Sequence, residues 1–345
     1  MCHYRAVLLV PFFLSGFALA QSSLTKPKPV KLVKTPFVRL NAGLGKQILR
    51  RMTKAELTVS FLGREVTVGS DGRNTEQWVK RDPKRGIRRE SIKPEGILLV
   101  DNQKRQFLVN QKEKLYREGK SQLAEFQKRY LEALRVGEGT LIIEFQGQDS
   151  IAGRLADVVL VHPAAGRAGP SRRFWVDRET GLRLRTEERA QEGRILSNTY
   201  YLSLELNPVL RDEDFAPPPI PAGFPRTVDT QKRYATLEEA AKDGVIVRQP
   251  GWLPAGFRLR RITASQGPHS PIHVQWGNDL TAISLALVHG AMPPMILRML
   301  AGNEAGFVQL NNGERAYAWK SSEGYYMLLG NLPDDQLKRI ADSVK

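Results

Sequence analysis

The stretch that decides the fold reads ADVVLVHPAAGRAGPSRRFWVDRETGLRLRTEERAQEGRILSNTYYLSLEL and spans residues 156–206. Apolar and polar residues alternate in four runs within it, at residues 158–162, 172–177, 182–188 and 195–206. Alternation with a period of two is the pattern of a β-strand that buries one face. Turn-forming residues separate the runs, and Gly181 suits a turn position with positive φ. The stretch therefore predicts consecutive hairpins of an antiparallel sheet with one charged, solvated face.

The residues before this stretch extend the same pattern. Short β-type runs occur at residues 57–61, 66–68, 77–80, 87–92, 97–101, 106–110 and 141–145. Two other segments repeat apolar residues at the spacing of a helix, one starting at Asn41 and one between Ser121 and Gly137. A sheet of this size should curl, and a helix can cover its concave side. We therefore predict a mostly-β α+β fold, in which a large curled antiparallel sheet forms an unclosed barrel with a covering helix.

The first twenty residues have the composition of a signal peptide. Arg5 supplies the positive charge, residues 6–20 are apolar, and the small residues Ala18 and Ala20 precede a cleavage point at Gln21. The apolar run is shorter than the roughly 20 residues that a membrane-spanning helix needs. We expect export to the periplasm with cleavage after Ala20. The single cysteine, Cys2, would be removed with the leader, so no disulfide or cysteine-based site is expected.

A proline-rich segment divides the rest of the chain. Clustered prolines interrupt helices and sheets and favour an extended backbone. We predict a basic, flexible lead-in at residues 21–40, a sheet domain at 41–214, a linker at 215–227 and a small α+β domain at 228–345. In the last of these, Thr236 and Glu239 form the pattern of a capping box, and an amphipathic helix closes the chain with Leu337 and Ile340 on its apolar side.

The positive charge is concentrated before the linker. The whole chain has a formal charge of +16, yet residues 227–345 contain 13 Lys and Arg against 11 Asp and Glu. The densest basic cluster comprises Lys80, Arg81, Lys84, Arg85, Arg88 and Arg89. In an exported protein it could contact anionic lipid head groups, lipopolysaccharide or an acidic protein, rather than nucleic acid. The alternative is that the cluster is simply a solvated strand face.

The search for catalytic or metal-binding residues finds no supported motif. His269 and His273 are four residues apart, but Pro268 and Pro271 rule out the helix that would bring them together. Neither a nucleophile elbow nor a zinc-protease motif is present. We therefore predict a protein that is not an enzyme and takes no metal or cofactor.

A large, sparsely covered sheet leaves room for a lipid-sized cavity. Its candidate lining residues are apolar or aromatic and lie on predicted strands, next to them or on the second helix: Val59, Phe61, Trp78, Leu98, Phe107, Phe126, Tyr130, Ile143, Val159, Phe174 and Tyr201. The alternative is that these side chains form an ordinary core, where aromatic residues at strand spacing are common.

Three segments carry a resemblance to a known family. Residues 174–185 resemble the hairpin of MucB/RseB proteins, with Arg183 where proline is usual; residues 251–257 resemble the loop that opens their smaller domain; and residues 313–344 resemble its closing strands and helix. The hairpin is also shared widely among LolA-like proteins. The resemblance implies a LolA/LolB-like first domain and a small second domain.

The resemblance also implies a function without catalysis. The first domain would sense lipid, lipoprotein or lipopolysaccharide during envelope stress. The second domain, with Trp252 and Phe257 as candidate contacts, would hold the periplasmic tail of a membrane anti-sigma factor. The main alternative is a lipid or lipoprotein carrier of the LolA type that has no sigma-factor partner, and an envelope hydrolase is a third. No nucleic-acid partner is expected, whereas peripheral contact with an anionic membrane surface is compatible with the charge.

Overall fold

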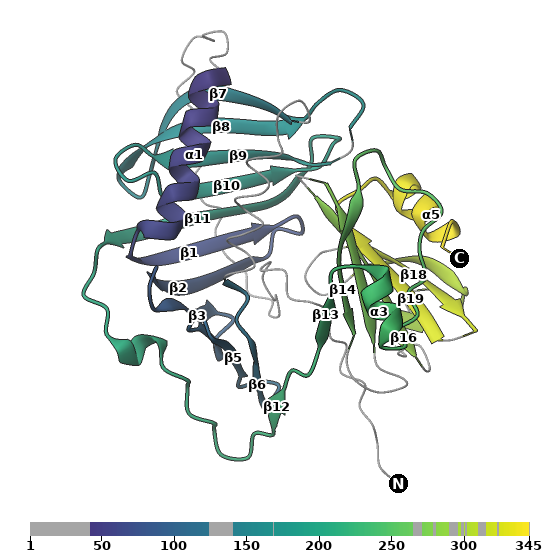
Figure 1. The fold of residues 1–345 in the computed structure, drawn as a ribbon. Helices are drawn as coiled ribbons and strands as arrows, with labels where there is room; N and C mark the ends of the chain where they lie inside the picture. The colour runs from purple at the N-terminus through teal and green to yellow at the C-terminus, as the bar shows by residue number, and fades with distance from the viewer. Residues whose placement is uncertain are drawn as a thin grey trace.

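The alternating runs of the first half form one twelve-stranded sheet (Figure 1). In this computed structural model, the strands are β1 (Phe61–Gly69), β2 (Asn74–Asp82), β3 (Gly86–Lys93), β4 (Ile97–Asp101), β5 (Arg105–Asn110), β6 (Leu115–Lys120), β7 (Leu141–Ile151), β8 (Arg154–Pro163), β9 (Ser171–Asp177), β10 (Arg183–Arg189), β11 (Ile195–Leu206) and β12 (Arg226–Val228). The structure describes residues 42–123, 141–167, 169–264, 271–278, 281–289, 296–297, 300, 302–309, 315–322 and 324–344. The leader, the lead-in and most of the helix predicted after Ser121 lie outside the described residues.

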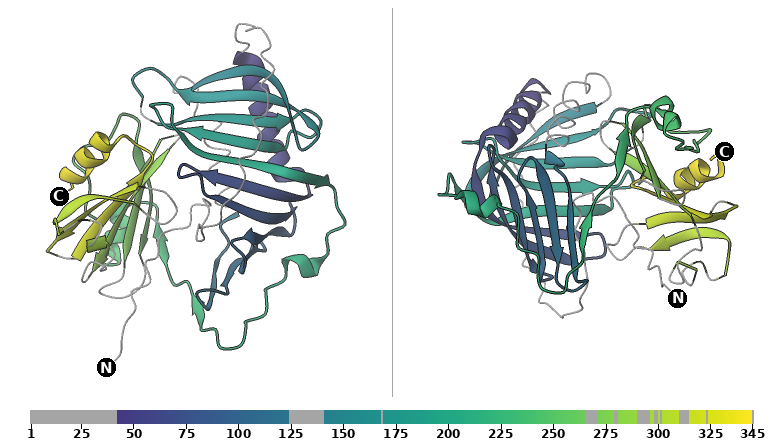
Figure 2. Two further views of the ribbon diagram at one scale, coloured as in Figure 1. Left: turned by 180° about the vertical axis from the view of Figure 1, so that it is seen from behind. Right: turned by 60° about the horizontal axis from the view of Figure 1, so that its bottom comes forward.

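The strand order shows how the sheet is assembled from two meanders. It runs β12-β6-β5-β4-β3-β2-β1-β11-β10-β9-β8-β7. The meanders β1–β6 and β7–β11 join where β1 pairs antiparallel with β11, with Phe61 opposite Leu206. Strands β7 and β12 lie at the two edges, so the sheet curls without closing into a barrel (Figures 1 and 2). This confirms the prediction of a mostly-β fold with a large unclosed sheet.

Helix α1 (Ala42–Thr58) covers one face of β7–β9 (Figure 1). Ile48, Leu49 and Met52 recur at helical spacing and are buried against the strands, as the sequence predicts. Burying each of these side chains contributes about 1.5–3 kcal/mol. The strand predicted at residues 57–61 is wrong in its first half. The helix continues to Thr58, since the Val59 amide still donates to the carbonyl of Ala55 at 2.9 Å, and β1 begins at Phe61.

After β12, the described residues form a second sheet of seven strands. They are β13 (Lys232–Tyr234), β14 (Arg258–Ala264), β15 (Ile272–Gly277), β16 (Ala282–His289), β17 (Ala305–Gln309), β18 (Arg315–Ser321) and β19 (Gly324–Gly330). Helices α3 (Leu237–Lys242) and α5 (Asp334–Asp342) pack on it (Figure 1). Leu337 and Ile340 of α5 are buried in its core, as predicted. The Glu239 amide donates to Thr236 Oγ1 at 3.1 Å, which confirms the helix cap. None of the described helices is long and apolar enough to cross a membrane.

The proline-rich segment lies against the twelve-stranded sheet. It begins after the short helix η1 (Asp212–Phe215), whose Phe215 is buried, and it ends at β12, which pairs parallel with β6. Between them, residues 216–225 have no helix or strand, and Phe224 packs against the apolar cluster of β4–β6. Figure 2 shows this segment looping from η1 to β12 beside the twelve-stranded sheet. The segment predicted as a linker is therefore attached to the twelve-stranded sheet at both ends.

Candidate ligand-binding faces of the twelve-stranded sheet

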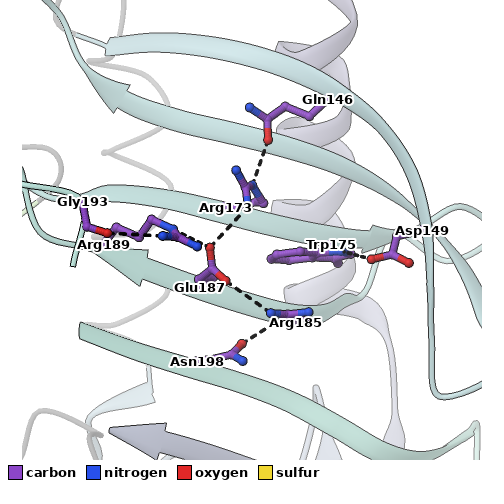
Figure 3. Close-up of polar contacts among 9 residues, drawn as sticks. All are labelled: Gln146, Asp149, Arg173, Trp175, Arg185, Glu187, Arg189, Gly193 and Asn198. Carbon is purple, nitrogen blue, oxygen red and sulfur yellow. Dashed lines mark hydrogen bonds and ion pairs between the residues drawn. The ribbon is translucent and has the colours of Figure 1, made fainter. Parts of the chain in front are cut away.

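Alternation along β9 separates the two faces of the sheet. Phe174 and Val176 pack beneath α1, whereas Trp175 between them belongs to a different cluster with Val158 and Leu184. We call the side that α1 covers the α1 face and the other side the opposite face. Figure 3 views the opposite face, with the helix behind the strands.

Five of the predicted cavity residues lie on the α1 face. Ile143, Val159 and Phe174 form part of the core beneath α1. Phe61 and Tyr201 pack edge to face with ring centroids 5.5 Å apart, in a separate cluster with Val79, Ile87 and Leu182. Burial raises the pKa of the Tyr201 hydroxyl well above its ordinary value, so this side chain stays neutral. Val59 is half-buried in the short connection between α1 and β1.

Three other candidates lie on the opposite face. Leu98 and Phe107 belong to the cluster of Val100, Val109 and Tyr116. Trp78 shares their face through the pairing of β2, β3 and β4, and 41% of it is exposed. Phe126 and Tyr130 lie outside the described residues. Within the described residues, the predicted set thus divides among separate clusters on two faces and does not line one cavity.

The basic cluster at residues 80–89 is divided in the same way. Lys80 and Arg85 bind Asp214 and Asp212 of η1, with N–O distances of 2.5 and 2.6 Å. Arg88 pairs with Glu90 at 3.3 Å, and Lys84 is exposed in the turn. On the α1 face, Arg81 donates to the Glu56 carbonyl and Arg89 pairs with Glu65 at 2.9 Å. Most of these cations therefore bind acidic or carbonyl groups of the chain itself and do not form one exposed patch.

A second arginine cluster, which we call the Glu187 network, lies on the opposite face of β9 and β10. The Glu187 carboxylate is only 6% exposed and contacts Arg189 at 2.7 Å and both Arg173 and Arg185 at 3.3 Å. Figure 3 shows the three guanidinium groups converging on it. Arg173 also donates to Gln146 at 2.8 Å, and Arg185 to Asn198 at 2.9 Å. Three cations share one carboxylate, so the network can accept a further anionic group.

Trp175 forms the apolar end of the Glu187 network. Its indole N–H donates to Asp149 at 2.8 Å, and the Arg185 guanidinium carbon lies 4.2 Å from its ring centroid, which is cation–π geometry. Burial lowers the pKa of Arg185, and Glu187 and Asp149 oppose that shift. The sequence held a signal for this site. Arg173 and Trp175, like Arg185, Glu187 and Arg189, are two residues apart, which places them on one face of a strand.

The comparison with protein families agrees with this architecture. The model of the MucB/RseB N-terminal domain matches residues 45–219, which is half of the chain and extends from α1 through the twelve-stranded sheet into the proline-rich segment. The chain belongs to the MucB/RseB family. No curated protein matches the sequence.

Solved structures of MucB share the fold across both sheets of this MucB/RseB-family chain. The MucA/MucB complex of Pseudomonas aeruginosa matches with a TM-score of 0.55 at 19% identity, and the match covers 87% of this chain and 98% of that one. MucB in complex with the periplasmic part of MucA gives the same values. At this identity the likeness concerns the fold alone.

Two further features concern Arg183 and the predicted partner contacts Trp252 and Phe257. Arg183, which stands where the family hairpin has proline, pairs with Glu56 of α1 at 3.4 Å. Trp252 and Phe257, the predicted partner contacts, are half-buried and pack against the core of the second sheet. The Arg339 guanidinium carbon lies 4.0 Å from the Trp252 ring centroid, so this tryptophan already has an intramolecular partner.

Proposed function

We propose that this protein is a non-catalytic periplasmic regulator that binds the periplasmic tail of a membrane anti-sigma factor. The observation that carries the proposal is membership of the MucB/RseB family, and the shared fold with MucB, solved in complex with MucA, supports it. In the same proposal, a lipid, lipoprotein or lipopolysaccharide releases the tail during envelope stress. The excess of basic residues before the linker supports an acidic tail or an anionic lipid as the ligand.

The Glu187 network is the surface that we propose for an acidic group of the partner. Its arginines are pre-positioned by their shared carboxylate, and guanidinium groups bind carboxylates in a fixed, two-pronged geometry. Arg189 is the most exposed of the three, with 36% of its side chain accessible. It is therefore the residue that an incoming carboxylate would reach first.

Affinity capture from an envelope extract of the source organism tests the partner. The tagged full-length protein should retain a single-pass membrane protein whose cytoplasmic part binds a sigma factor. Recovery of lipids and lipoproteins without such a protein would instead favour the carrier alternative. A fluorescent fatty-acid probe tests the release signal separately, because absence of saturable binding would remove its basis.

The surface is tested with a peptide of the recovered protein's periplasmic tail. We expect Arg189→Glu to weaken peptide binding about tenfold, because it replaces attraction by repulsion at the contact. Arg194→Glu is the matched control, since Arg194 lies in the next turn and pairs with Glu192, and both side chains are more than half exposed. Equal effects of the two substitutions would show that overall charge, and not the Glu187 network, governs binding.

A further inference from the structure

A pocket lies between the twelve-stranded sheet and the proline-rich segment. It has a volume of about 340 Å³, and its walls come from the β4–β5 turn, β5, β6 and residues 217–226. This volume is at the lower end of the range of about 300–1,000 Å³ that is typical of small-molecule sites. The pocket shares no residue with the Glu187 network, so the two are separate sites and can bind different ligands.

The floor and roof of the pocket are apolar. Phe107 and Tyr116 form the floor and are 4% and 3% exposed, and Pro217 and Ile220 of the proline-rich segment cover them. Ile220 is 46% exposed, although it lies over an apolar floor. A ligand with an apolar body would remove this surface from water, which favours binding through the hydrophobic effect.

The rim of the pocket is cationic. Arg226 donates to Glu118 Oε2 at 2.6 and 3.2 Å, Arg105 donates to Oε1, and the Glu118 side chain is 5% exposed. One carboxylate thus binds two guanidinium groups, and Lys104 adds a third positive charge to the lining. The lining therefore has an excess of positive charge beside an apolar floor.

The pocket is held in shape by contacts at both ends of its roof. On one side, Lys80 and Arg85 bind Asp214 and Asp212 of η1. On the other, β12 pairs with β6, and the Asp229 amide donates to the Glu118 carbonyl at 2.7 Å. In the middle, the Tyr116 hydroxyl donates to the Pro218 carbonyl at 3.3 Å. Because the pocket is preformed, ordering its walls costs little of the binding free energy.

We propose that this pocket binds a small amphipathic monoanion, such as a medium-chain carboxylate, with the apolar body on Phe107 and Tyr116 and the carboxylate at Arg105, Arg226 and Lys104. The volume suits about a dozen non-hydrogen atoms, because a water molecule occupies about 30 Å³ in the liquid. The proposal is independent of the anti-sigma partner, and its test uses this protein alone.

Calorimetric titration of the full-length protein with octanoate tests the ligand class. We expect saturable binding that weakens at high ionic strength, because the rim charges are partly exposed. Octylammonium has the same apolar body with the opposite charge and should bind at least about tenfold more weakly. Equal binding of the two probes, or no saturable binding of octanoate, would overturn the proposal.

Two pairs of variants assign the binding to this pocket. Ile220→Trp should abolish octanoate binding by filling the space under the roof, whereas Val209→Trp, on a side chain that is 94% exposed, should leave it unchanged. Lys104→Glu should weaken binding about tenfold, and Lys112→Glu, in the exposed turn after β5, should not. These substitutions avoid buried charges, so thermal unfolding should match the wild type. Binding that survives Ile220→Trp would place the ligand elsewhere and overturn the assignment.

Discussion

At the scale of single residues, Glu187 shows how burial changes the value of a charge. Its carboxylate is nearly inaccessible and compensates three arginines of β9 and β10. Loss of one partner in a buried ion pair costs much more than loss of an exposed pair, because the remaining charges stay desolvated. The Glu187 network is therefore a structural element as well as a candidate binding surface.

We expect Glu187→Gln to lower the free energy of unfolding by about 3 kcal/mol, because three guanidinium groups lose their shared anion. Equilibrium unfolding in urea measures the change. The matched control is Glu192→Gln, whose exposed pair with Arg194 should contribute less than about 1 kcal/mol. Similar small losses in both variants would mean that solvent or other groups satisfy the three arginines once the carboxylate is removed.

His273 of β15 is the residue from which we expect a pH dependence. The residue is 8% exposed, and within the described part of the chain neither ring nitrogen has a hydrogen-bond partner. Burial lowers the pKa of His273 to about 4, and Arg261 adds to the lowering. The folded state therefore favours the neutral ring, so its contribution to stability is present above pH 6.5 and is lost as pH falls toward 4.

Between pH 7 and pH 5, we expect His273 to reduce the free energy of unfolding by about 2 kcal/mol. Asp177 and Asp214 also have lowered pKa values, but starting from 3.8 they lose their contributions only at lower pH. Urea unfolding at both pH values measures the difference. His273→Phe keeps the size of the ring without the titration and should flatten the profile. A profile that is unchanged in this variant would assign the pH dependence to other groups.

At the scale of elements, the β9–β10 hairpin combines local turn chemistry with a contact that only the fold creates. Asp177 Oδ1 accepts from the amides of Glu179 and Thr180 at 2.9 and 2.8 Å, so the turn forms as the sequence predicts. Gly181 at the end of this turn has φ of +80°. A Cβ at this position would lie 2.9 Å from the Arg51 carbonyl oxygen, so α1 packs directly against the turn.

We expect Gly181→Ala to cost about 3 kcal/mol or more, since it adds a clash with α1 to the backbone strain. Gly193 in the β10–β11 turn is the matched control. Its φ is +88°, but a Cβ there would meet nothing within 4 Å, so Gly193→Ala should cost only about 1–2 kcal/mol. Urea unfolding of both variants measures the two costs. Equal losses of unfolding free energy in the two variants would show that α1 shifts to make room for the added methyl group.

The strands were easier to predict than their faces. Alternation of apolar and polar residues located most strands of both meanders, because a strand with one buried face has this pattern in its sequence. Whether residues on distant strands lie on the same face depends on the pairing register. A register shift of one residue moves every side chain of a strand to the other face of the sheet. Trp78 and Tyr201 were predicted to share a lining. The pairing of Glu65 with both Gln77 and Tyr201 places Tyr201 on the α1 face, whereas Trp78, the neighbour of Gln77, lies on the opposite face.

At the scale of the whole molecule, the proposed periplasmic location depends on the leader. We expect the protein recovered from the periplasmic fraction to begin at Gln21, because the small residues at positions 18 and 20 suit signal peptidase. Intact-mass measurement and N-terminal sequencing check this. An intact Met1 on the exported protein, or its retention in the cytosolic fraction, would contradict the proposed location.

The sequence by itself determined the mostly-β class, the hairpin turns and the apolar stripes of α1 and α5, because these depend on spacing along the chain. Only the tertiary structure decided which groups the charged side chains pair with. Lys80 and Arg85 find their partners in η1 more than a hundred residues away, and Glu187 gathers arginines from β9 and β10. A charge run has the same sequence whether it meets water or a distant carboxylate, and its partners are set by strand order and register. For the same physical reason, the basic cluster at residues 80–89 is largely compensated within the chain. The side chains of the Glu187 network share a strand face in the sequence, but only the pairing of β9 with β10 brings them into contact.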